Sequence, residues 1–134
     1  MNIPTFLTLY GISVPVFFAI DMVWLGLVAS DFYKSRLGDL MGPINWPAAI
    51  IFYLVFLVGL TFFAIYPAAM KGSVITALTL GALFGFFTYA TYDLTNLATL
   101  RDWPLSVSIV DMIWGTVLGG AVTAVTVYVY VHFL

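Results

Sequence analysis

Cysteine is absent from this chain, and charged residues are scarce. Because none of the 134 residues is a cysteine, disulfide bonds and thiolate metal sites are excluded. Charged residues make up 7% of the sequence, whereas soluble globular domains carry about a quarter. The four lysine and arginine residues are too few to form the basic surface that nucleic acid requires. Sequence motifs for haem or nucleotide binding are also missing, so these cofactors have no support in the sequence.

Hydrophobic residues dominate instead. They make up 63% of the sequence, and the intervals 1–20, 40–70, 72–92 and 112–131 contain no charged side chain. A helix of about 20 residues crosses the ~30 Å hydrocarbon layer of a membrane. The unbroken runs lack the alternation of a β-barrel and the polar stripe of a soluble bundle. We therefore predict an all-α, integral membrane four-helix bundle in a single domain, residues 1–134, with transmembrane spans at residues 4–29, 46–70, 73–100 and 104–134.

The few basic residues predict the orientation of the bundle. Lys34 and Arg36 lie in the first connection and Arg101 in the third, whereas Lys71 lies in the second, on the opposite side. Cytoplasmic connections carry an excess of lysine and arginine. We therefore expect the first and third connections in the cytoplasm and both termini on the outer side.

Local patterns predict how the connections are built. Residues 45–47 (NWP) and 102–104 (DWP) each place an Asn or Asp cap and a proline at the start of a span. The first connection is expected to form a short interfacial helix, capped by Ser30 or Asp31 and stopped at residues 42–43 (GP).

Pairs of glycines in the third and fourth spans predict close helix packing. Gly81 and Gly85 are four residues apart, as are Gly115 and Gly119. Small residues at this spacing allow the backbones of two transmembrane helices to approach each other.

Three aspartates interrupt the apolar spans: Asp21, Asp93 and Asp111. Each stands about eight residues, or ~12 Å along a helix, from the cytoplasmic end of its predicted span, so all three are expected at one depth. A charged aspartate at the centre of a transmembrane helix costs ~3 kcal/mol, and no Lys, Arg or His lies at this depth. We therefore predict that the three acids form one buried ion or ligand site.

Other side chains are expected close to the acids, with Tyr53 at the same level and Asn96 one helical turn further toward the cytoplasm. The candidates are Tyr53 in the second span, Tyr92 and Asn96 in the third, and Trp24 and Trp114, each three residues after an acid. Because the first and fourth spans run in opposite directions, we expect the two tryptophans on opposite sides of the acid level.

Buried acids without a counter-charge are compatible with several arrangements. Protonated acids can bond to Tyr53, Asn96 or one another and lock the helices together. Alternatively, a cation lies among them, including a metal ion held by Asp21, Asp93 and Asp111, or water reaches them. We favour a functional site, because Ser, Thr or Asn would lock the helices at a lower cost.

Several segments resemble those of a known family. They are AIDMVWLGLVASDFY, NWPAAIIFYLVFLVGL, GALFGFFTYATYDLTNLATLRDWP and VDMIWG. Together they resemble a bacterial family of small four-helix membrane proteins, domain of unknown function 2177. The resemblance covers nearly the whole chain and implies a multi-pass protein of the bacterial inner membrane, with no activity attached.

Three classes of function remain open. The first is binding and transport of a cation or proton by a homo-oligomer in the lipid bilayer, with the acids as ligands and Asn96 and Tyr53 shaping the site. The second is a metal-dependent enzyme acting on a lipid or isoprenoid, with the acids holding Mg²⁺. The third is a non-catalytic subunit of a membrane-protein partner, or a binder of an apolar cofactor that contacts the Trp and Phe surfaces.

Overall fold

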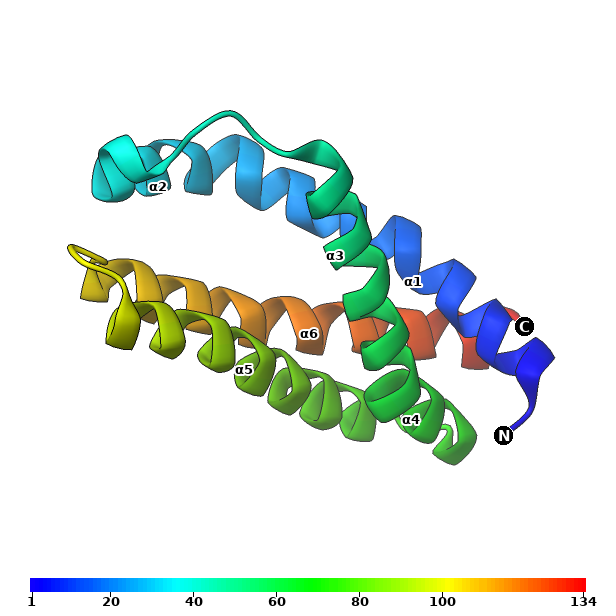
Figure 1. The fold of residues 1–134 in the computed structure, drawn as a ribbon. Helices are drawn as coiled ribbons and strands as arrows, with labels where there is room; N and C mark the ends of the chain where they lie inside the picture. Colours follow the sequence, from blue (N-terminus) through cyan, green and yellow to red (C-terminus); the bar gives the residue numbers. More distant parts are fainter.

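The computed structural model describes residues 1–134 and contains helices and no strands (Figure 1). Four helical spans are long and apolar enough to cross a membrane, which confirms the predicted all-α bundle. They cover Ile3–Leu40, Trp46–Lys71, Val74–Thr99 and Leu105–Phe133. Both termini lie at the same end of the bundle (Figure 1), and the side of the membrane that they face stays a prediction.

Nine helical segments make up these spans. In chain order they are α1 (Ile3–Trp24), the π-helical η1 (Leu25–Ala29), α2 (Ser30–Leu37), the 3₁₀ turn η2 (Gly38–Leu40), α3 (Trp46–Leu60), the π-helical η3 (Thr61–Ile65), α4 (Tyr66–Lys71), α5 (Val74–Thr99) and α6 (Leu105–Phe133). Figure 1 shows α5 and α6 as a close antiparallel pair, with α1 beside α6 and α3 leading from the α1 side of the bundle to α4.

The first span continues further than the sequence predicted. The helix passes from α1 through η1 into α2 without a break, so neither Ser30 nor Asp31 caps a separate interfacial helix. The α-helix ends at Leu37, because Gly38 has a φ of 53° that only glycine adopts readily, and the 3₁₀ turn η2 extends the span to Leu40 rather than to residues 42–43. The predicted cap was wrong because no glycine or proline forces a break at residue 30, and the wider η1 turn carries the helix onward.

One of the two predicted helix caps is confirmed. The Asn45 side chain accepts a hydrogen bond from the Ala48 backbone N–H at 3.2 Å. Asp102 instead adopts φ 61° in the turn before α6, and Pro104 takes the cap position without a side-chain hydrogen bond. The prediction for Asp102 was wrong because the short α5–α6 turn needs a left-handed residue there, a conformation that Asp tolerates better than most residues.

Glycines hold α5 and α6 together at backbone distance. A Cβ atom added at Gly81 would collide with the Gly119 carbonyl oxygen, and one added at Gly85 would collide with the Gly115 carbonyl oxygen. No side chain fits at these crossings, so the predicted close packing of the third and fourth spans is confirmed.

On α1 and α5, the buried residues form a line along one helix face that includes an aspartate. In α1, every fourth residue is buried along the series Leu9, Ser13, Phe17 and Asp21. In α5, the buried residues Ala77, Gly81, Gly85 and Asp93 follow the same spacing, with the half-buried Tyr89 completing the series. Residues four apart lie on one helix face, so each carboxyl group is placed by the face that packs into the bundle.

The two π-helical turns have different causes. Pro67 follows η3 and has no N–H to complete the regular helical ladder, which explains the widened turn before it. No proline is present in or near η1. The η1 turn contains an additional residue and therefore rotates α2 by about 100° relative to a regular helix.

Candidate functional site

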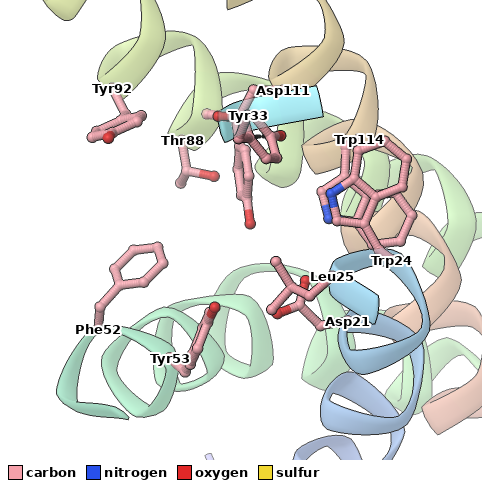
Figure 2. Close-up of a pocket in the computed structure, with 11 residues that line it drawn as sticks. Asp21, Trp24, Leu25, Tyr33, Phe52, Tyr53, Thr88, Tyr92, Asp111 and Trp114 are labelled. Carbon is pink, nitrogen blue, oxygen red and sulfur yellow. Dashed lines mark hydrogen bonds between the residues drawn. The ribbon is translucent and has the colours of Figure 1, made fainter. Parts of the chain in front are cut away.

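A cavity of about 350 Å³ lies between the four spans, and each span contributes to its wall (Figure 2). Its lining consists of Asp21, Trp24, Leu25, Tyr33, Phe52, Tyr53, Thr88, Tyr89, Tyr92, Asp111 and Trp114. Most of these side chains are aromatic, and the two carboxyl groups are the acidic ones among them. The cavity therefore combines an apolar, aromatic wall with two carboxyl groups.

The structure brings most of the predicted site residues to this cavity. Those in its wall are Asp21, Asp111, Tyr53, Trp24, Trp114 and Tyr92. Asp93 and Asn96 do not line it. Residues from all four spans therefore lie around one cavity, as expected from their distances to the span ends, whereas Asp93 and Asn96 do not share its surface.

Asp93 lies behind the cavity wall, in the α5–α6 interface. It is fully buried, and its carboxyl group lies next to that of Asp111, although no hydrogen bond of good geometry joins the two. Its backbone carbonyl accepts from the Ser108 hydroxyl at 3.0 Å, and that hydroxyl accepts from the Trp103 indole N–H at 3.0 Å. Asn96 is half-buried one helical turn further along α5. These bonds fix the turn between α5 and α6 to the level of the acids.

Asp111 is held by a residue that the sequence argument missed. The Tyr33 hydroxyl on α2 donates a hydrogen bond to Asp111 Oδ1 at 2.8 Å, and both side chains face the cavity (Figure 2). The sequence placed Tyr33 in an interfacial helix outside the span, and no motif marks it as a site residue. Only the continuous helix through η1 shows that Tyr33 reaches α6.

Asp21 has no such partner for one of its oxygens. The residue is 4% exposed, and no hydrogen bond of good geometry reaches its buried Oδ2 atom, although the Tyr53 and Trp114 side chains lie beside the carboxyl group. Figure 2 shows its carboxyl group on the opposite side of the cavity from Asp111. The basic side chains do not line the cavity; Lys34, Arg36, Lys71, Arg101 and His132 are all exposed. The cavity therefore contains a buried carboxyl group with no basic side chain beside it.

Trp24 and Trp114 stack on each other in the cavity wall. Their ring centroids are 4.4 Å apart and their planes differ by 6°. The prediction that they lie on opposite sides of the acids was wrong, because it followed the helix backbones only. Helical side chains lean toward the N-terminus of their helix, so indoles on two antiparallel helices can meet. The Trp114 indole N–H is buried without a partner, and Figure 2 shows the indole nitrogens on the cavity side of the stack.

Aromatic rings form much of the remaining wall. Phe17 and Phe18 pack against the Tyr53 ring at centroid distances of 5.1 and 5.7 Å, which fixes its position. A Cβ atom at Gly115 would collide with the Tyr89 ring, so this glycine makes room for Tyr89. The sequence analysis also missed Tyr89 as a cavity residue, although it belongs to the series of positions spaced four residues apart from Gly81 to Asp93.

The geometry does not gather a set of metal ligands. No group of three or more Asp, Glu, His or Cys side chains is arranged to hold a metal ion. Asp21 and Asp111 line the cavity from different sides, and Asp93 is separated from it. The three acids predicted as a metal set therefore do not converge on one point.

The four apolar spans and the cavity between them define the class: a multi-pass membrane protein. Residues 6–128 match the model of the family described as Predicted membrane protein (DUF2177), and the chain belongs to this family. A search of curated proteins and a search of solved structures found no match. The family description names no activity, so the function must be argued from the cavity.

Proposed function

We propose that this protein binds a cation inside the membrane, in the cavity between its four spans, as the binding step of transport. The observation that carries the proposal is the Asp21 carboxyl group. It is almost completely buried and lines the cavity, and one of its oxygens has no partner. Ionisable side chains inside a membrane are costly and usually mark ion or substrate pathways.

A purely structural role for the acids fits these contacts less well. Polar side chains that lock helices together satisfy one another by hydrogen bonds. Here no hydrogen bond of good geometry reaches Asp21 Oδ2 or either carboxyl oxygen of Asp93, although Tyr53 and Trp114 lie beside Asp21 and Asp111 lies beside Asp93. Asn96, which was expected to contribute to a neutral network, does not line the cavity. The acids therefore retain unused hydrogen-bonding capacity.

The wider setting of the proposal comes from the sequence. We propose a location in the bacterial inner membrane, which the family resemblance implies. The distribution of Lys and Arg supports an orientation with the first and third connections in the cytoplasm. A homo-oligomer belongs to the same proposal, because four spans are few for a complete transport pathway.

Thermal stability in detergent tests cation binding. A ligand present at a hundredfold excess over its Kd stabilises the folded state by ~2.7 kcal/mol, so a bound cation raises the Tm of the wild type. Na⁺, K⁺, Mg²⁺ and organic ammonium ions should be compared, and Asp21→Asn is expected to lose most of the increment. Asp39→Asn is the matched control, because Asp39 is exposed and outside the cavity. If no cation raises the Tm in an Asp21-dependent manner, the proposal is wrong.

One observation favours a second candidate, the binding of a flat apolar cofactor. The Trp114 indole N–H, which lies on the cavity side of the stack, can donate to a carbonyl group, and the aromatic side chains of the wall offer apolar surface. In that case a neutral aromatic carbonyl compound would stabilise the protein, Trp114→Phe would remove the effect and Asp21→Asn would retain it. A metal-dependent lipid enzyme receives no support, because the acids do not converge and no basic side chain lines the cavity.

A further inference from the structure

We infer that the cation is an organic ammonium ion with an aromatic or alkyl body, which reaches the cavity from the lipid bilayer. This inference rests on the proposed function and specifies its ligand class. Three independent observations support it: the size of the cavity, the chemistry of its wall and the residues at its rim.

The size of the cavity argues against a bare ion. Its volume of about 350 Å³ falls within the range of small-molecule sites, roughly 300 to 1,000 Å³. A dehydrated Mg²⁺ or Ca²⁺ requires six or more oxygen ligands at 2.0–2.6 Å. The chain gathers no such set of carboxylates. An organic cation can fill this space, whereas a metal ion would leave most of it empty.

The wall combines the two groups that recognise an ammonium ion. The Asp21 carboxyl group supplies negative charge and an unused hydrogen-bond acceptor. The rings of Tyr53 and Phe52 in the wall supply aromatic surface of the kind that attracts organic cations. A protonated amine can therefore donate to Asp21 while its apolar part lies against the rings.

The rim of the cavity indicates where the ligand enters. Phe52 is 52% exposed and Tyr92 is 58% exposed, and Figure 2 places both across the cavity from the Trp24–Trp114 stack. Leu25 in η1 is 36% exposed. All three lie within helical spans, so their exposed surfaces face lipid when the protein is in a membrane. An amphiphilic amine that partitions into the bilayer would meet this opening directly.

The test compares two ligands of nearly equal size. 2-Phenylethylamine is protonated at pH 7, whereas 2-phenylethanol replaces its ammonium group by a neutral hydroxyl. Their affinities for the detergent-solubilised wild type should be measured by isothermal titration calorimetry. A charge-assisted hydrogen bond to Asp21 is expected to make the amine bind at least about tenfold more tightly than the alcohol.

Variants of the chain locate the binding site. Asp21→Asn is expected to remove the difference between amine and alcohol, whereas Asp39→Asn should retain it. Phe52→Leu at the exposed rim is expected to weaken binding of the amine without loss of folding. The comparison of the two ligands on the wild type decides the question of charge even if Asp21→Asn fails to fold.

The remaining outcomes separate this inference from the proposed function. If only inorganic cations bind in an Asp21-dependent manner, the organic ligand class is wrong and cation binding stands. Equal affinities for amine and alcohol would overturn the inference, as would a neutral aromatic ketone that binds more tightly than the amine. If no cation of either kind binds through Asp21, both proposals fail.

Discussion

Asp21 and Asp93 each end a series of buried positions spaced four residues apart, but their carboxyl groups lie in different surroundings. Asp21 meets the cavity, whereas Asp93 is enclosed between α5 and α6. In the sequence, Tyr92, Thr95 and Asn96 give Asp93 polar neighbours on both sides. The structure makes Asp21 the better candidate for ligand binding.

This difference predicts the effect of Asp93→Asn. Because Asn keeps the shape of the side chain and Asp93 does not line the cavity, the variant should retain the cation-dependent rise in Tm and lose little stability. The measurement is a thermal melt with and without cation, beside wild type and Asp21→Asn. A loss of the cation effect as large as that of Asp21→Asn would show that Asp93 takes part in binding.

Tyr33→Phe tests the contact between α2 and α6. The substitution removes the hydrogen bond to Asp111 and leaves a carboxylate oxygen unpaired. We expect a loss of roughly 1 to 3 kcal/mol in the free energy of unfolding. Tyr128→Phe is the matched control, since Tyr128 is half exposed near the end of α6 and outside the cavity. Equal stability of the two variants would mean that the Tyr33 bond adds nothing.

At the scale of elements, the α5–α6 pair depends on backbone contact. Gly85→Ala would place a methyl group against the Gly115 carbonyl, which cannot move aside as a flexible side chain can. We expect a loss of roughly 1 to 3 kcal/mol in the free energy of unfolding from this overpacking, measured in detergent.

Gly11→Ala provides the control for this prediction. Gly11 lies within α1 with open space around its Cβ position, so alanine should be neutral or stabilising through its higher helix propensity. If the two alanine variants unfold alike, the close approach of α5 and α6 does not limit stability.

The elements also show what the sequence could predict. Gaps between charged residues were sufficient to define four spans, because the hydrocarbon layer fixes the length of a crossing helix. The glycine pairs indicated the α5–α6 contact. The continuation through η1 was not predictable, because a π-helical turn depends on hydrogen-bond geometry and leaves no composition signal in LGLVA. The position of Tyr33 follows from that turn and was missed with it.

At the scale of the whole molecule, the convergence of the acids was predicted in part. The number of residues from the span ends predicted that Asp21 and Asp111 lie at one depth, and both line the same cavity. It could not show that Asp93 is enclosed by α6, since depth along a helix does not define direction around it. The stacking of Trp24 on Trp114 was missed for the same reason.

The orientation in the membrane leads to a prediction for intact cells. The chain contains no cysteine, so Ser35→Cys and Phe133→Cys each introduce a unique thiol, and both positions are exposed. With both termini outside, an impermeant thiol reagent should label the cysteine at position 133 and leave that at position 35 unlabelled until the cells are opened. Labelling at position 35 alone in intact cells would show that the topology is the reverse of the predicted one.

The Trp24–Trp114 stack also has an optical consequence. Two nearly parallel indoles at 4.4 Å interact electronically, so their near-ultraviolet circular dichroism and fluorescence depend on the distance between α1 and α6. The pair therefore acts as a built-in spectroscopic reporter of the cavity. A movement of either helix during a functional cycle would change this signal without any added label.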